Sequence, residues 1–143
     1  MRKLKFYICK ILTTYFWSKK RKMRELKQHL ERFIENIETY TKNEGVNEYF
    51  KIKNRNDNSL DFQYGFNNLY LVGRLSLKTG QEIILIKVYH TLNDLKETHL
   101  ENLDTMILPS GRIYFLNRTD VTIDVNDYMN KLILTIRTNI NLS

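Results

Sequence analysis

The stretch MRELKQHLERFIENIETY, residues 23–40, decides how the rest of the chain folds, because it carries the clearest helical pattern in the sequence. Its apolar side chains recur at intervals of three and four residues and line one face of a helix, while charged side chains fill the other faces. The apolar positions are Met23, Leu26, Leu30, Phe33, Ile34, Ile37 and Tyr40. Such a stripe has to be covered, and we expect a β-sheet to cover it. Gly45 suits a left-handed cap, so the helix is predicted to end near residues 43–45.

The residues before this helix, LKFYICKILTTYFW at 4–17, also show helical spacing, which predicts a second helix ahead of it. A helix of this length spans about 21 Å, short of the ~30 Å hydrocarbon core of a membrane, and Lys10 interrupts it. The basic run 19–22 stands where signal-peptide cleavage requires small residues, which disfavours a secretory signal. We expect residues 4–17 to pack on the body of the protein or on a partner chain, with a membrane interface as the alternative. The positions that share the main apolar face are Leu4, Ile8, Ile11, Leu12 and Tyr15.

Charge is distributed very unevenly along the chain. The first 30 residues hold ten Lys or Arg and a single acid, a net charge of +9, whereas the other 113 residues carry −2. This asymmetry indicates a polyanionic or membrane partner. The candidate polyanion-binding residues are Lys10, Lys19, Lys20, Arg21, Lys22, Arg24 and Lys27. Aromatic residues interleave with these cations, and those expected to stack on bases or to lie at a membrane interface are Tyr15, Phe16 and Trp17.

From Val46 onward the apolar period changes from 3.6 to two residues, which predicts an antiparallel β body over residues 46–143. Asn67 and Asn68 form the expected two-residue hairpin loop, because Asn tolerates positive φ. Helical spacing of leucines predicts a short helix at 91–103. The predicted strands are 48–53, 60–66, 69–77, 82–89, 106–108, 112–117, 121–125 and 131–140.

Together these patterns predict a single α+β domain over residues 1–143. It should contain two N-terminal helices, with residues 1–22 as a basic aromatic helical arm. A strongly curved antiparallel sheet or small barrel of seven to eight strands, with one short inserted helix, should follow. One cysteine, Cys9, excludes an intramolecular disulfide framework and is compatible with a reducing compartment.

The sequence lacks the common catalytic motifs. Phosphate-binding glycine loops, paired cysteines, HExxH and GxSxG are all missing. His90 and His99 follow each other closely enough to act as an acid–base pair on a phosphodiester, although one surface and one packed histidine is the simpler interpretation. The acids of TDVTIDVND, residues 119–127, lack the calcium-loop pattern and are interpreted as a solvated strand. We therefore predict no catalytic residues, no metal site and no cofactor.

The resulting hypothesis is a non-enzymatic binding protein that uses a basic N-terminal helical arm to engage an anionic partner, with nucleic acid slightly favoured. The alternatives are a peripheral membrane-associated or protein-interaction module, including a homo-oligomer, and a phosphodiester-acting enzyme that uses His90 and His99. The expected location is cytoplasmic, with a peripheral position at a membrane as a variant of it.

Overall fold

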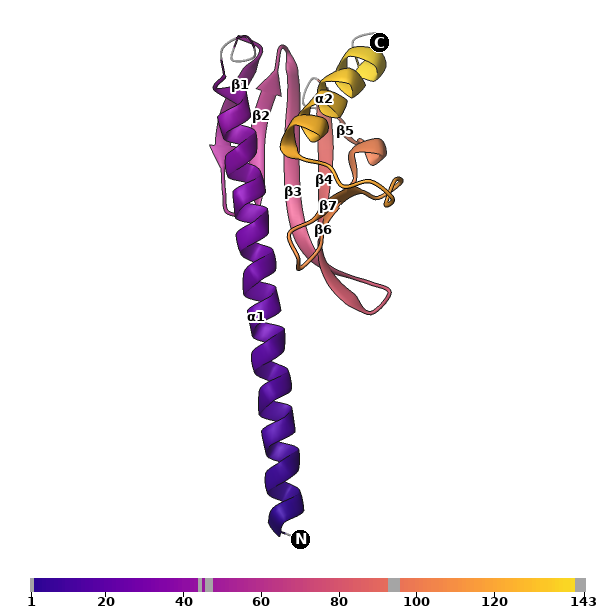
Figure 1. Ribbon diagram of the computed structural model, residues 1–143. Coiled ribbons are helices and arrows are strands. Elements are labelled where there is room, and N and C mark those ends of the chain that lie inside the picture. Colours follow the sequence, from indigo (N-terminus) through magenta and orange to yellow (C-terminus); the bar gives the residue numbers. More distant parts are fainter. Residues whose placement is uncertain (1, 44, 46–47, 93–95, 141–143) are drawn as a thin grey trace.

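The computed structural model describes residues 2–43, 45, 48–92 and 96–140, and of these it describes only the backbone for residues 2–16, 92, 139 and 140. It shows a single α+β domain in which a long N-terminal helix is followed by a seven-stranded antiparallel sheet and a short C-terminal helix (Figure 1). The α+β class predicted from the sequence is thereby confirmed.

The N-terminal helix, α1, is one continuous element over Arg2–Thr41, so the prediction of two separate helices was wrong. Its 40 residues make a rod of about 60 Å. Residues 18–23, Ser-Lys-Lys-Arg-Lys-Met, contain neither Gly nor Pro, and Lys, Arg and Met are good helix formers. The basic run therefore continues the helix instead of separating two helices. Past its end Gly45 adopts φ +92°, the left-handed conformation expected of a residue that ends a helix.

The sheet is open, with strand order β1-β2-β3-β4-β6-β7. The strand β5 lies outside this order and pairs with the C-terminal end of β4, beyond the part that pairs with β6. The sheet is not closed into a barrel, because β1 and β7 stand at opposite edges of this order. Thr79 and Gly80, at φ 49° and 77°, make the tight turn between the two longest strands. The strands are β1 Phe50–Arg55, β2 Ser59–Tyr64, β3 Asn67–Lys78, β4 Gln81–Leu92, β5 Lys96–His99, β6 Thr105–Ile107 and β7 Ile113–Phe115.

The hairpin between β2 and β3 turns two residues earlier than predicted. Gly65 and Phe66 form the turn, with Gly65 at φ 59°, whereas Asn67 and Asn68 already pair with β2. Glycine adopts positive φ more readily than asparagine, and this moves the turn. Phe66 is consequently fully exposed at the tip of the hairpin.

Two predictions for the second half of the chain were also wrong. The helix expected at 91–103 is absent from the described part of that range, where the chain forms the end of β4, the strand β5 and the 3₁₀ turn Glu101–Leu103. The strands expected at 121–125 and 131–140 are instead a loop and the helix α2, Val125–Thr135, which continues as a π-helical turn, Ile136–Ile140.

A capping box starts α2. The carboxylate of Asp124 accepts a hydrogen bond from the backbone N–H of Asp127 at 2.8 Å, and the carboxylate of Asp127 accepts one from the N–H of Asp124 at 3.1 Å. These bonds satisfy backbone donors that the first turn of a helix would leave unpaired. Two of the three acids in the TDVTIDVND stretch, Asp124 and Asp127, thus mark the start of a helix.

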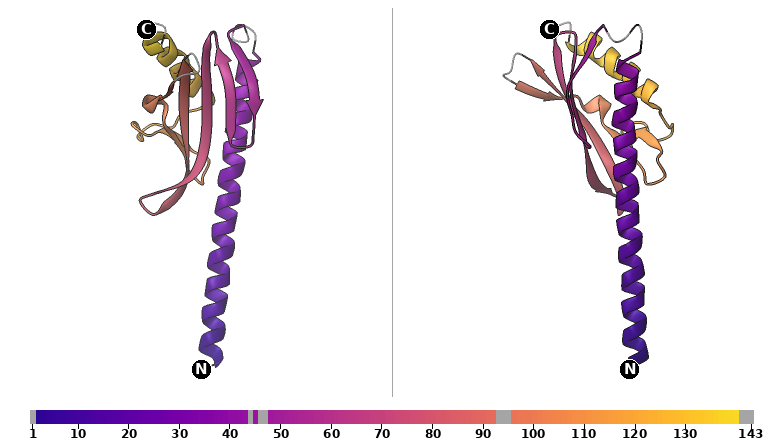
Figure 2. Two further views of the ribbon diagram at one scale, coloured as in Figure 1. Left: turned by 180° about the vertical axis from the view of Figure 1, so that it is seen from behind. Right: turned by 90° about the vertical axis from the view of Figure 1, so that its left-hand side faces the viewer.

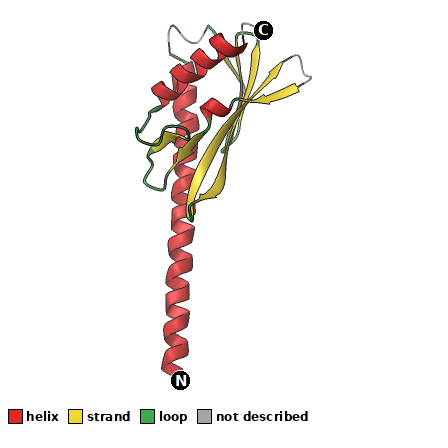
Figure 3. Ribbon diagram, turned by 90° about the vertical axis from the view of Figure 1, so that its right-hand side faces the viewer, coloured by secondary structure: helices red, strands yellow, loops and turns green. Residues whose placement is uncertain are grey.

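Both helices pack on the same face of the sheet (Figures 2 and 3). The ring of Phe33 on α1 meets the ring of Tyr128 on α2 edge-on, with centroids 5.2 Å apart. Leu30 lies against the backbone of Gly73 in β3, where a Cβ atom would come within 2.5 Å of the leucine Cδ1. The predicted stripe of 23–40 is therefore the face of α1 that covers the sheet, as expected.

Phe33 is buried at 2% exposure, so Phe33→Ala should lower the free energy of unfolding by about 3–5 kcal/mol through a lost apolar side chain and a new cavity. Urea denaturation measures the change. Phe66→Ala is the matched control, because the Phe66 side chain is fully exposed and its loss should stay within about 0.5 kcal/mol. Equal effects of the two substitutions would contradict the packing of α1 on the sheet.

Candidate functional site

The first half of α1 extends away from the rest of the molecule in every view (Figures 1 and 2). The body begins to accompany the helix near Lys19, whose ammonium Nζ lies 3.6 Å from Glu82 Oε1 of β4. From Leu26 onward the helix buries its apolar face in the core. Apart from Lys10, which lies farther out on the projecting half of α1, the basic residues predicted to bind a polyanion therefore occupy the place where the helix leaves the body.

Several of these cations share the side of α1 that faces away from the sheet. At 3.6 residues per turn, Lys20, Arg21 and Arg24 fall on the half of the helix opposite the buried Leu26 and Leu30. We call this surface the outer strip, and its members, all of them exposed, are Trp17, Lys20, Arg21, Arg24 and Lys27, the last at its edge.

Charge on the outer strip is only weakly neutralised by the protein itself. Arg21 lies 3.6 Å from Glu25 one turn later, but its side chain is 82% exposed, so water screens this pair strongly. Trp17 is 68% exposed at the start of the strip. The strip therefore presents a large ring followed by four cations to the solvent.

The two remaining cations of the run point toward the body. Lys19 and Lys22 line a cleft of about 480 Å³ between α1 and the turn that joins β3 to β4, and Glu82 stands on its other wall. Because Lys19 already pairs with Glu82, this cleft is less suited to a large anion than the outer strip is. The structure thus divides the predicted basic site into two surfaces.

The side chains of Lys10, Tyr15 and Phe16 lie outside the described residues, although their backbone is helical. On a helix, the apolar residues of 4–17 recur on all sides and not along one stripe only. An isolated helix of this kind is poorly compatible with water, so the projecting half of α1 needs an apolar environment. No helix in the part of the chain that the structure describes is long and apolar enough to cross a membrane.

The structure does not bring His90 and His99 together. They lie on β4 and β5, where His90 pairs with Thr98 and His99 pairs with Tyr89, so the two imidazoles point to opposite faces of the sheet. His90 is buried and its Nε2 lies 3.2 Å from Asn67 Oδ1. This arrangement provides no shared acid–base site for a phosphodiester.

His99 has a partner that sequence reasoning missed. Its Nε2 lies 2.6 Å from the carboxylate of Asp104, which orients the imidazole against the ring of Tyr89. The pairing of His99 with Tyr89 follows from the extension of β4, and the helix predicted for 91–103 concealed it. Within the described residues, no cluster of three or more metal-binding side chains is present.

Comparison with known proteins identifies no relative: no family model, curated protein or solved structure matches the chain.

Burial lowers the pKa of His90 below its ordinary value, so the unfolded chain binds a proton more readily there than the folded chain does. The stabilising contribution of the neutral imidazole should be present above about pH 6.5 and be lost as the pH falls below that value. We expect the free energy of unfolding, measured by urea titration at stepped pH, to decline less steeply in His90→Gln than in the wild type. His29→Gln is the matched control, and an identical decline in both variants would contradict the assignment.

Proposed function

We propose that the protein is a non-enzymatic binding protein that attaches through α1 to an anionic membrane surface. The observation that carries this proposal is the outer strip, a ring and four exposed cations placed where an apolar helix leaves the body. Tryptophan is favoured at the level of lipid headgroups, and Lys or Arg beside it gain from anionic lipid. The proposed location is the cytoplasmic membrane surface, whose leaflet is rich in anionic lipids.

The direction of the outer strip supports a helix that lies along the surface. Since the strip faces away from the sheet, α1 can rest on the headgroups while the body stays on the solvent side of the helix (Figure 3). Lys20, Arg21 and Arg24 then meet the phosphates, and the apolar ring of Trp17, on the same side of α1, enters the boundary with the acyl chains. Interfacial helices bury such residues by about 5–10 Å.

Lipid accounts for the composition of α1 better than nucleic acid does. The projecting half is rich in Leu and Ile, which gain from an acyl environment but do not stack on bases. The sequence pattern alone placed nucleic acid slightly ahead because it considered the cations and aromatic residues without their placement. The projection of an apolar helix from the body reverses that order of preference.

Nucleic acid remains the second candidate, because the exposed guanidinium groups of Arg21 and Arg24 suit any phosphate. In that case binding would fall steeply with salt through counterion release. Loss of all binding to single- and double-stranded DNA and RNA at ~50 mM salt would end this candidate for α1.

Replacing Lys20, Arg21, Arg24 and Lys27 together by Gln should release the protein from vesicles that contain anionic lipid. Each cation contributes about 1 kcal/mol near such a surface, so the partition coefficient should fall by about a thousandfold. Vesicle flotation measures it, with neutral phosphatidylcholine vesicles in parallel. Glutamine keeps the helix propensity nearly constant, so the melting temperature should hold.

A control with the same net charge replaces four exposed cations elsewhere: Lys42, Lys96, Arg112 and Arg118. This variant should float with the vesicles as the wild type does. Equal release of both variants would show that net charge, and not the outer strip, determines binding. If the wild-type protein does not bind vesicles that contain anionic lipid, the membrane proposal is overturned.

A further inference from the structure

Among the residues that the structure describes, no helix lies on the second face of the sheet. Both α1 and α2 lie on one side, and the other side is left uncovered by them (Figures 2 and 3). Strand register identifies which side chains belong to this open face. Tyr70 pairs with Tyr89 and Val72 pairs with Lys87, and strand alternation puts both pairs on the face opposite Leu71 and Val88, although Val72 is only 6% exposed.

Three rings form a row across neighbouring strands of the open face. Tyr70 of β3 stands opposite Tyr89 of β4, and Tyr89 stands opposite His99 of β5. The rings of Tyr89 and His99 have centroids 5.2 Å apart at an angle of 34°, and Asp104 fixes the imidazole from behind. Tyr70 is 37% exposed and the side chain of His99 is 27% exposed, so the row is accessible to a ligand.

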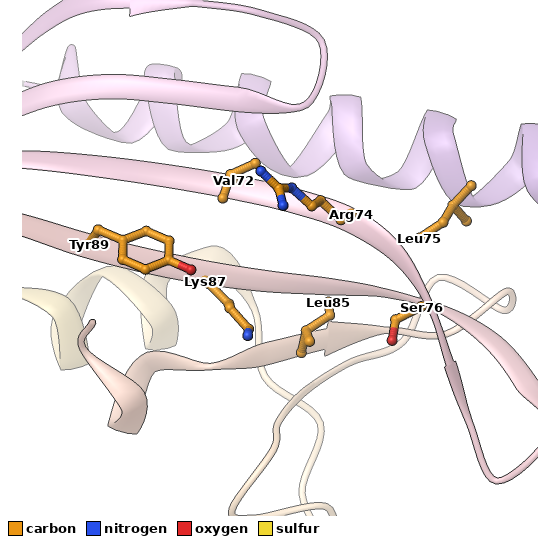
Figure 4. A pocket seen from close by; sticks show the side chains of 7 residues that line it. All are labelled: Val72, Arg74, Leu75, Ser76, Leu85, Lys87 and Tyr89. Carbon is orange, nitrogen blue, oxygen red and sulfur yellow. The ribbon is translucent and has the colours of Figure 1, made fainter. Parts of the chain in front are cut away.

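Two cations stand beside this row. Arg74 and Lys87 line a hollow of about 230 Å³ with Tyr89 and Ser76, and their side chains come from the neighbouring strands β3 and β4 (Figure 4). Neither cation has a hydrogen bond or ion pair to any residue that the structure describes. The hollow has room for about seven waters and therefore for a phosphate group.

The rest of the open face carries more cations than acids. At the far edge, Lys53 Nζ donates a hydrogen bond to Asn68 Oδ1 at 2.9 Å, and Lys51 stands at the next outward position of β1. The acids on this face are Asp61 of β2 and Glu97 of β5, and the cations Lys51, Lys53, Arg74 and Lys87 outnumber them. The face thus combines a row of rings with an excess of positive charge.

We propose that the open face binds single-stranded nucleic acid, with bases stacked on Tyr70, Tyr89 and His99 and phosphates held by Arg74 and Lys87. Stacking on aromatic rings beside a basic groove is how single strands are bound without readout of a specific sequence. This site is separate from the outer strip and goes beyond the membrane function proposed for α1.

The positive charge of the open face disfavours a second copy of the chain as its occupant. A two-fold interface through this face would bring the Arg74–Lys87 pair of one copy close to the same pair of the other, and like charges there oppose association. A phosphate backbone is complementary to the same cations. The rings of Tyr70, Tyr89 and His99 can also stack on nucleic-acid bases, whereas an acidic peptide would gain less from them.

The test measures fluorescence anisotropy of labelled oligo-dT and oligo-rU of about 12 nucleotides at ~50 mM salt. All substitutions are made in the full chain that already carries Gln at the four outer-strip cations, so that binding by α1 does not contribute. In this background Tyr70→Leu and Tyr89→Leu should each weaken binding about 5- to 150-fold, because leucine keeps apolar bulk but cannot stack. Arg74→Gln and Lys87→Gln should each reduce the logarithmic salt slope by about 0.7.

Tyr49→Leu is the matched control, since this ring is 51% exposed, lies just outside β1 and packs on Tyr64 of the opposite face. It should leave the affinity unchanged. Equal affinity in the control and in the Tyr70 and Tyr89 variants would overturn the proposal, as would absence of oligonucleotide binding in the outer-strip background. A concentration-dependent dimer that Lys87→Gln strengthens, with no oligonucleotide bound, would assign the face to a second copy instead. Since vesicle flotation is measured independently, failure here leaves the membrane proposal standing.

Discussion

The packing of α1 across the sheet is the contact on which the rest of the structure depends. Leu30 lies directly on Gly73 of β3, a position that a larger residue would obstruct, and Phe33 meets Tyr128 of α2 edge-on. These contacts join the first, middle and last parts of the chain in one core. An antiparallel sheet of this size needs an apolar cover on one face, and α1 and α2 supply it together, α1 through a single stripe.

Because α1 is continuous, the same helix that covers the sheet also positions the basic residues. Leu26 is fully buried, whereas Arg24 and Lys27 on either side of it are exposed. Because positions on a helix have fixed relative directions, burial of the stripe in the core also holds the outer strip on the side of α1 that faces away from the sheet. A flexible arm would have presented its cations in all directions and lost more conformational entropy on binding.

The success of sequence-based prediction followed the strength of the local pattern. Residues 23–40 were predicted correctly because their apolar period is long and unambiguous, and the strands predicted at 69–77 and 82–89 lie within the observed β3 and β4. The C-terminal helix was missed because a short run of Leu and Ile, residues 132–136, reads equally well as a strand. The spacing of Asp124 and Asp127 was the available signal for a helix start, and it was interpreted as a solvated strand face.

The candidate sites also differ in how far they could be predicted from the sequence. Cations on α1 could be found from composition, but their separation into the outer strip and the cleft beside Glu82 required the helix to be continuous and packed. The ring row of Tyr70, Tyr89 and His99 could not be found from sequence, because it depends on the register of three strands, and a one-residue shift would turn each ring to the other face.

The two proposed surfaces lie on opposite sides of the molecule, because the outer strip faces away from the sheet and the open face is the side of the sheet away from α1 (Figure 2). A membrane beneath α1 would therefore not cover Tyr70 or Arg74, and a single strand on the open face would not displace lipid. Repulsion between the anionic lipid and the nucleic acid would be weakened by the intervening domain and by salt, since the Debye length is only about 8 Å at physiological ionic strength. The fold thus permits both surfaces to be occupied at once, with the helix-covered core as the spacer between them.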